Sequence, residues 1–202
     1  ITAPIFDLKA ENMCDLIEPG EIVGYITKEA SLDLGIKEGT PVIASGSDKG
    51  CETLGSGCVD STGASLSLGT TATVQMTTDK YIETEPFVPT YPAVLPGKYN
   101  PEIEIYRGYW MISWFKNEFA HKEVKEAQEI GISAEELLNR HLKDVPAGCE
   151  GLILQPYWTP GIKHQTARGA ILGFADCHTR IHIYRAIIEG IAYVLYDGLL
   201  SI

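Results

Sequence analysis

Long apolar runs are missing from this sequence. None approaches the roughly 20 consecutive apolar residues that a membrane-spanning helix needs, and the first residues show no secretory signal pattern. Cysteine is also scarce, with five residues at irregular spacing and no C-x-x-C pair: Cys14, Cys51, Cys58, Cys149 and Cys177. This pattern indicates reduced intracellular thiols and argues against a disulfide framework or a zinc site. We therefore predict a cytoplasmic protein with no membrane partner.

Positively charged residues are also few. The 202 residues carry 16 Lys and Arg against 27 Asp and Glu, a formal net charge of -11. Such a balance argues against nucleic acid or an anionic membrane surface as the main partner. It does not exclude a nucleotide, because local N–H donors and a metal ion can hold phosphates whatever the overall charge.

What is present is typical of a soluble globular protein. Hydrophobic residues make up 45% of the chain and charged residues 21%, which is ordinary for such proteins. The length suffices for one domain with its own core, or for parts of two. No internal repeat or low-complexity segment is evident.

The first informative stretch is residues 41–48. Residues 41–44 predict a buried strand, Ser45-Gly46-Ser47 a small-residue turn, and Asp48 the start of a helix. The pattern leaves two interpretations of Asp48 open. Either it is an N-cap that accepts backbone N–H groups, or its small neighbours leave room for a ligand and it acts as a general base. The helix that follows is expected to turn Cys51 and Leu54 inward.

A second stretch, residues 63–78, predicts a β-hairpin. Leucines and serines alternate before Gly69-Thr70-Thr71, and a returning strand follows that turn,. A glycine and two hydroxyl residues at a hairpin tip can present N–H and O–H donors to a phosphate. A polar turn that binds nothing has the same local sequence, so the turn alone does not decide between the two.

Periodicity and end signals predict the remaining elements. Helices are expected over residues 27–35, 108–119, 133–142 and 178–200, strands over 22–26, 103–108 and 152–154, and a proline-rich irregular loop over 83–101,. The aromatic stripe of the 108–119 helix is typical of a core. Residues 121–130 are expected to form a solvated helical face. Glu189 lies within a mainly apolar helix, so it should be paired or hydrogen-bonded.

Histidine offers one candidate metal pair. His178 and His182 lie one helical turn apart, the spacing of two ligands on one face. No third ligand is nearby in the sequence, so the pattern favours surface or core histidines. His164 is expected to be an exposed loop residue.

Taken together, the stretch PVIASGSDKGCETLGSGCVDSTGASLSLGTTATV resembles the core of the FGGY carbohydrate kinases, the family of glycerol, xylulose and gluconate kinases. A second block agrees, since ARGAILGF (167–174) and HIYRAIIEGIAY (182–193) resemble the family's strand, loop and helix signature. The resemblance implies an α/β protein with part of a ribonuclease H-like fold of the actin/hexokinase type. Residues 1–59 would end the N-terminal sugar-binding domain and residues 60–202 would begin the nucleotide-binding domain, so we expect the middle part of a family member.

The resemblance also implies a site. Asp48 falls on the catalytic general base, Gly69-Thr70-Thr71 on the phosphate hairpin, and Gly108 and Ser113 beside the nucleotide. The implied ligands are ATP and a sugar, polyol or sugar acid whose hydroxyl receives the γ-phosphate. Mg²⁺ would bridge the phosphates and keep several waters, so no metal site made of protein ligands is expected. A homodimer is an expected arrangement of the full-length protein.

Two positions depart from the family pattern. Lys49 stands where many relatives carry Asn or Gln beside the catalytic Asp, and it is a predicted substrate-binding residue. It either meets an anionic sugar acid or pairs with Asp48 or Glu52 and holds Asp48 ionised. Gly161-Ile162-Lys163 replaces the Gly-Glu-Arg of many members, so a charge is displaced or missing there.

Two other functional classes compete with the kinase interpretation. Asp48 and Glu52 lie i, i+4 on one helical face, as an acid/base pair of a carboxylate-dependent hydrolase would, although such neighbours converge more closely than an inverting glycosidase needs. The other class is a non-catalytic binding module of the same fold. It is consistent with a piece that lacks the family's N-terminal phosphate hairpin and adenosine loop, and we expect the piece alone to be inactive.

Overall fold

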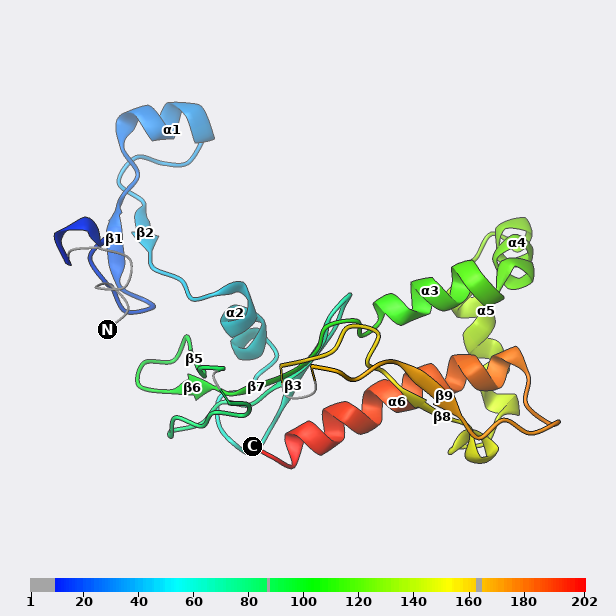
Figure 1. The fold of residues 1–202 in the computed structure, drawn as a ribbon. Coiled ribbons are helices and arrows are strands. Elements are labelled where there is room, and N and C mark those ends of the chain that lie inside the picture. The colour runs from blue at the N-terminus through cyan, green and yellow to red at the C-terminus, as the bar shows by residue number, and fades with distance from the viewer. Residues whose placement is uncertain (1–9, 87, 163–164) are drawn as a thin grey trace.

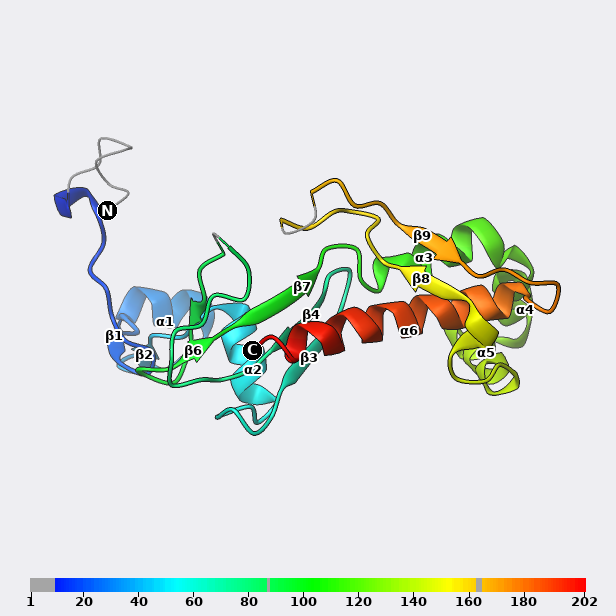
Figure 2. The same ribbon diagram turned by 60° about the horizontal axis from the view of Figure 1, so that its bottom comes forward.

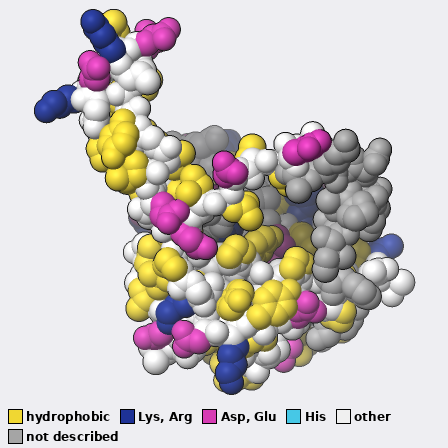
Figure 3. All heavy atoms as spheres, turned by 90° about the vertical axis from the view of Figure 1, so that its left-hand side faces the viewer, with side chains coloured by type: hydrophobic (Ala, Val, Ile, Leu, Met, Phe, Trp, Pro, Cys, Tyr) yellow, Lys and Arg dark blue, Asp and Glu magenta, His cyan; other side chains and the backbone are white. Residues whose placement is uncertain are grey.

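The computed structural model describes residues 10–86, 88–162 and 165–202 of the chain. These ranges form an elongated α/β body from which an N-terminal arm projects (Figures 1 and 2). The tip of this arm stands clear of the body in the space-filling view (Figure 3). The predictions for Lys163 and His164 fall outside the described residues.

The arm is built from a two-stranded ribbon and one helix. Strand β1 (Ile22–Tyr25) pairs antiparallel with β2 (Pro41–Ile43), and α1 (Lys28–Leu34) lies between them in the chain, after a short 3-10 helix at Ala10–Asn12. Thr27 and Gly35, the ends of the predicted helix, are the caps of α1; Gly35 has φ +68°, a left-handed conformation that glycine adopts without strain,. The predicted burial of residues 41–44 is wrong. Strand β2 is exposed because its ribbon stands away from the body.

Helix α2 (Asp48–Gly55) begins at the predicted residue but is capped by its neighbour. The Ser47 hydroxyl accepts the Gly50 N–H at 3.1 Å, so Ser47 is the N-cap and Asp48 is the first helical residue. The buried residues of α2 are Gly50 and Thr53. Cys51 and Leu54, expected to point inward, are only partly buried, because α2 lies over a polar surface and buries its threonine there.

A three-stranded antiparallel sheet forms the centre of the molecule, in the order β3-β4-β7. Strands β3 (Ser65–Leu68) and β4 (Ala72–Gln75) make the predicted hairpin, with Gly69-Thr70-Thr71 at its turn. Strand β7 (Glu102–Ile105) pairs with the other edge of β4. Since successive side chains of a strand point to opposite faces, the sequence pattern of each strand divides between the two sides of this sheet.

The two faces of the sheet are chemically unlike. The apolar face packs against the last helix through residues of β4 and β7 that are at most 8% exposed: Ala72, Val74, Ile103 and Ile105. Leu66 and Leu68 of β3 lie on the same face but are 59% and 50% exposed. The polar face lies toward α2, and the strand register aligns its residues in two rows: Ser65, Gln75 and Glu102, then Ser67, Thr73 and Glu104. This division places all polar groups of the sheet on the side that carries Asp48.

The proline-rich residues 83–101 are irregular, as predicted, except for one short hairpin. Strands β5 (Tyr91–Pro92) and β6 (Tyr99–Asn100) pair antiparallel. Asn100 is only 1% exposed and donates hydrogen bonds to the Met76 carbonyl and the Thr77 hydroxyl, each at 3.0 Å. These bonds fix the loop to the end of the central sheet.

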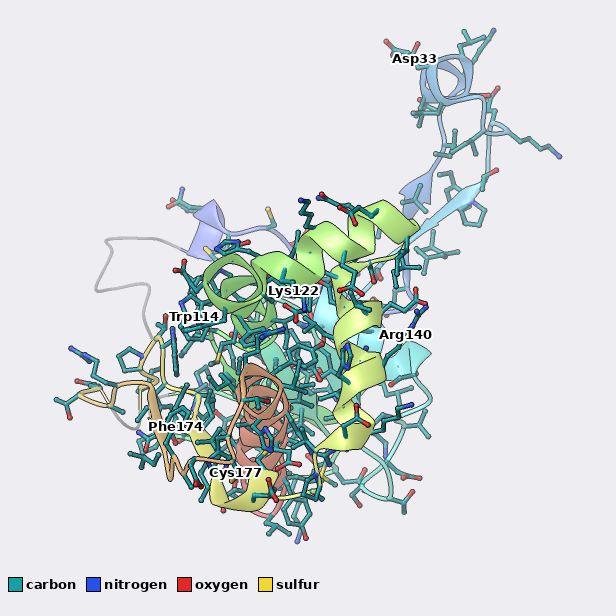
Figure 4. All side chains as sticks on the ribbon, turned by 90° about the vertical axis from the view of Figure 1, so that its right-hand side faces the viewer. Asp33, Trp114, Lys122, Arg140, Phe174 and Cys177 are labelled. Carbon is teal, nitrogen blue, oxygen red and sulfur yellow. The ribbon has the colours of Figure 1, made fainter. Side chains whose placement is uncertain are left out.

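Three helices gather at the opposite end from the arm: α3 (Trp110–Phe119), α4 (His121–Ile130) and α5 (Ala134–His141), which a short 3-10 helix (Leu142–Asp144) follows. Figure 4 looks onto this end, with Lys122 and Arg140 on the outer helices and Asp33 far away on the arm. Ser133 caps α5 as predicted, accepting the Glu136 N–H at 3.0 Å. Residues 121–130 are not wholly solvated as expected, because Arg180 pairs with the buried Glu123.

The aromatic stripe of α3 is part of the core, as predicted. Phe115 is fully buried, and its ring centroid lies 5.4 Å from that of Tyr184 and 5.9 Å from that of Phe119. Trp110 and Trp114 are partly buried against the same cluster. Phe119 ends the stripe and is 44% exposed.

Helix α6 (Arg180–Leu199) runs along the molecule between the sheet and the helical end (Figure 2). Beside it lies a ribbon of β8 (Ile153–Gln155) and β9 (Ala170–Leu172), preceded by a 3-10 turn at Cys149–Gly151. The buried face of α6 contains Tyr184, Ile187, Ile191 and Leu195. Within the described ranges, no helix combines the length and apolar character needed to cross a bilayer.

Glu189 of α6, which is partly buried, is paired and hydrogen-bonded as expected. It accepts hydrogen bonds from Arg185 Nε at 2.6 Å and from the Gly148 backbone N–H at 3.1 Å. Burial alone raises the pKa of Glu189, but hydrogen bonds from Arg185, Gly148 and Cys149 outweigh burial and hold the pKa below its ordinary value. The network therefore favours the ionised carboxylate.

Acid should remove this contribution to stability. Because the folded pKa of Glu189 is depressed, its contribution is complete above about pH 4.5 and is lost as the pH falls through the folded pKa. We expect Glu189→Gln to lower the free energy of unfolding at neutral pH by about 1–3 kcal/mol. The variant should also lose less of this free energy than the parent protein as the pH falls. Urea midpoints across the acidic range, with exposed Glu129→Gln as control, measure both effects. If Glu189→Gln and the parent protein lost the same free energy of unfolding on acidification, the stabilising role of the ionised Glu189 carboxylate would be refuted.

Candidate active site

An open cleft lies where the N-terminus of α2 faces the polar side of the sheet. Its volume is about 260 Å³. Residues of α2, the hairpin, the proline-rich loop and β7 line it: Ser47, Asp48, Lys49, Thr71, Thr73, Tyr91, Glu102 and Glu104. The fold thus brings together Asp48, Lys49 and Thr71, which the sequence analysis selected from two separate stretches.

Asp48 lies at the mouth of this cleft. Its side chain is exposed, and its Oδ1 accepts the Lys49 backbone N–H at 2.7 Å. As the first residue of α2, it also lies at the positive end of the helix dipole, where a carboxylate interacts favourably with the free N–H groups. The position leaves the other carboxylate oxygen available to a ligand in the cleft.

The ammonium group of Lys49 contacts two other side chains of the protein. Its Nζ lies 3.1 Å from Glu52 Oε2 and donates a hydrogen bond to the Ser67 hydroxyl at 2.8 Å. Of the two carboxylate partners that the sequence allowed, the structure therefore selects Glu52. The bond to Ser67 connects α2 with β3, since these residues belong to different elements.

Two more hydrogen bonds hold α2 and the segment after it against the sheet. The hydroxyl of Thr53 bonds to Gln75 Oε1, and both residues are at most 3% exposed. The Thr77 hydroxyl donates to the Cys58 carbonyl at 2.7 Å. The sequence analysis missed these residues, although the polar positions of β4 were the available signal. Their effect is to fix the orientation of Asp48 relative to the hairpin.

The hairpin tip packs against the start of α3. The Gly69 carbonyl accepts the Tyr109 N–H at 3.0 Å, and Gly69 N–H donates to the Thr71 carbonyl at 3.0 Å. Gly108 allows this approach, since an added Cβ would lie 2.4 Å from both the nitrogen and the Cβ of Ala72. Gly108 therefore meets the hairpin as expected.

Four of the five sequence-predicted nucleotide residues, Gly108 among them, lie outside the cleft lining. Gly69 and Thr70 form the exposed tip of the hairpin, next to Thr71, which does line the cleft. Ser113 lies on an exposed part of α3 and does not join the cleft. The structure thus groups Gly69-Thr70-Thr71 with Gly108 and leaves Ser113 apart.

Comparison with known proteins shows the family of this chain. A model of the FGGY family of carbohydrate kinases, C-terminal domain, matches residues 64–202. The chain belongs to the FGGY family. It is 31% identical over 203 residues to the uncharacterized sugar kinase YgcE of Escherichia coli, covering 96% of this chain and 40% of that protein. It is 25% identical over 206 residues to a gluconokinase of Bacillus subtilis, covering 98% of this chain and 39% of that protein.

The solved structures agree with this FGGY assignment. The ligand-bound xylulose kinase of Lactobacillus acidophilus superposes with a TM-score of 0.80 at 25% identity, over 98% of this chain and 39% of that one. The predicted fold class, α/β with part of a ribonuclease H-like fold, is confirmed. The FGGY chain described here spans about 40% of the length of these relatives.

Two cleft residues of this FGGY chain escaped the sequence analysis. Glu102 and Glu104 come from alternate positions of β7, so both point to the polar face,. Burial raises the pKa of Glu102, against the effects of hydrogen bonds from Thr73 and Gln75 and of the Lys49 charge. Burial also raises the pKa of Glu104, and the negative charge of Glu102 raises it further. Their i, i+2 spacing was the only signal in the sequence.

The histidine pair has protein partners on all four ring nitrogens. His178 bonds to the Ala175 N–H and the Cys149 carbonyl, while His182 contacts Thr179 and lies 3.0 Å from Glu150 Oε2. Across residues 10–86, 88–162 and 165–202, no group of three or more His, Cys, Asp or Glu side chains is arranged to hold a metal ion. The donors near Asp48 suit a magnesium ion that keeps most of its waters and takes one or two carboxylates.

Proposed function

We propose that this chain forms the phosphoryl-transfer centre of an ATP-dependent carbohydrate kinase. The observation that carries the proposal is the single cleft shared by Asp48 and the hairpin residue Thr71. A hydroxyl to be phosphorylated must meet a base and a phosphate in one place. The relatives are sugar kinases, a gluconokinase and a xylulose kinase, which supports ATP and a sugar, polyol or sugar acid as substrates.

In the proposed reaction, Asp48 accepts the proton of the acceptor hydroxyl. The acceptor oxygen then forms a bond to the γ-phosphorus, the bond from that phosphorus to the β–γ bridging oxygen breaks, and ADP leaves with the electron pair. Thr71 and the backbone N–H groups of the hairpin hold the phosphate oxygens on which negative charge develops. Lys49, held by Glu52 and Ser67, adds one positive charge beside them.

The residues present fit a nucleotide phosphate and a hydrated magnesium ion. Gly69, Thr70 and Thr71 offer N–H and O–H donors at an exposed turn, where a phosphate can approach,. When bound, Mg²⁺ supplies neutralisation of the phosphate charge. Gly108, packed on the hairpin, keeps the start of α3 close to this region, and Ser113 is a weaker candidate for a contact. The cytoplasmic location and the homodimer remain predictions.

The test is ADP release by the product of the full reading frame that encodes this chain. Purified protein is given Mg-ATP with separate panels of polyols, ketoses and sugar acids, and ADP is measured by a coupled assay. Release that depends on one class of acceptor supports the kinase. Sugar hydrolysis without ATP would instead support the carboxylate hydrolase. Neither ADP release nor hydrolysis with any substrate would support the binding module. Glu52 is already paired with Lys49, which disfavours it as a hydrolytic acid.

A further inference from the structure

The charges of the cleft bear on the choice of acceptor, given the kinase function proposed above. Three carboxylates line it, from Asp48, Glu102 and Glu104, against a single cation, Lys49. The ammonium of Lys49 is already engaged by Glu52 at 3.1 Å and by Ser67 at 2.8 Å. The cation that an anionic acceptor would need is therefore bound to the protein's own groups.

Glu102 and Glu104 add to this negative field. Both lie on the polar face of β7, in register with Gln75 and Thr73 of β4. Glu102 is partly buried and Glu104 is exposed, and loss of hydration raises the pKa of each. In such surroundings a third negative charge interacts with the two carboxylates more strongly than it would in bulk water.

The phosphates of ATP and the carboxylate of a sugar acid differ in this setting. Phosphates arrive with a magnesium ion that neutralises part of their charge, and the hairpin offers them N–H and O–H donors. A sugar acid brings no counter-ion into the cleft. Its carboxylate would have to displace Glu52 from Lys49 or lie among uncompensated acidic groups.

We infer that the acceptor is a neutral sugar or polyol, and that Glu102 and Glu104 exclude sugar acids from the cleft. Neutral hydroxyls can donate hydrogen bonds to these carboxylates, which accept but do not donate when ionised. Glu102 and Glu104 thus act as specificity-determining residues. This choice separates the chain from its gluconokinase relative, although the sequences are similar.

The test compares kcat/KM for acceptors that differ mainly in a carboxylate. Sorbitol and gluconate form one such pair, and the neutral ketoses and other aldonates extend the comparison. We expect the parent protein to favour the neutral class by about 100-fold or more, from roughly tenfold discrimination by each of two carboxylates. Glu102→Gln and Glu104→Gln should each shift the ratio toward aldonates by about tenfold, and the double variant by more.

The controls separate this inference from the kinase proposal. Glu129→Gln, on the exposed surface of α4, should leave the ratio unchanged, and urea midpoints check that the cleft variants are folded. A parent protein that prefers aldonates, and loses that preference in Lys49→Met, would overturn the inference while leaving the kinase intact. Unchanged ratios in both glutamate variants would also overturn it. No ADP release with either neutral or acidic acceptors would overturn the kinase proposal itself.

Discussion

We expect the Asp48→Asn variant to release ADP about 10²–10⁴-fold more slowly than the parent protein. Asparagine keeps the size of the side chain and its place as the first residue of α2, but it cannot accept the proton of the attacking hydroxyl. The helix cap is unaffected, because Ser47 and not Asp48 accepts the Gly50 N–H. The loss should therefore appear in kcat, with little change in ATP binding measured by calorimetry.

The matched control for this variant is Asp33→Asn. Asp33 lies on α1 at the tip of the projecting arm, far from the cleft (Figure 4), so its replacement should leave turnover unchanged. Turnover in Asp48→Asn within a factor of about three of the parent value would exclude Asp48 as the general base, since general-base catalysis contributes at least about 10²-fold.

The largest effect on stability is expected at Phe115. Its side chain is fully buried and packs against Tyr184 of α6 and Phe119 of its own helix. Phe115→Ala would remove that ring and leave a cavity where α3 and α6 meet, at a cost of about 3–5 kcal/mol in the free energy of unfolding. Urea or thermal unfolding, followed by far-UV circular dichroism, measures this loss.

Phe119→Ala is the matched control, because it makes the same chemical change one turn further along α3. Phe119 is 44% exposed, so its truncation should cost about 1 kcal/mol or less, by the area of apolar surface that it keeps from water. Equal losses in the two variants would show that the stripe is not divided between core and surface as the structure has it.

The sequence predicted those elements whose signals are local. The helix starts at Thr27 and Ser133, the hairpin around Gly69-Thr70-Thr71 and the aromatic core stripe each depend on neighbouring residues, and each is observed. Asp48 and Thr71 also proved to share one cleft. The roles of these residues remain predictions, as does the division of the chain between residues 59 and 60.

Features that depend on tertiary pairing were not accessible from the sequence. Glu102 and Glu104 enter the cleft only because β7 pairs with β4 in one particular register, and a one-residue slip would turn both outward. The burial of residues 41–44 was predicted from their apolar character, yet burial needs a covering element, and β2 is exposed among the residues that the structure describes. The incomplete burial of Cys51 and Leu54 likewise follows from the polarity of the surface beneath α2.

The two sides of the central sheet respond differently to water. Helix α6 adheres to the apolar side, and separating the two would expose the buried residues around Val74 and Ile103. Helix α2 meets the opposite side through polar contacts, Lys49 with Ser67 and Thr53 with Gln75. Water can take over such hydrogen bonds at a small net cost, typically about 1 kcal/mol each. The carboxylate of Asp48 therefore lies on the helix whose contacts with the sheet are polar, while the apolar contacts of the core lie on the other side.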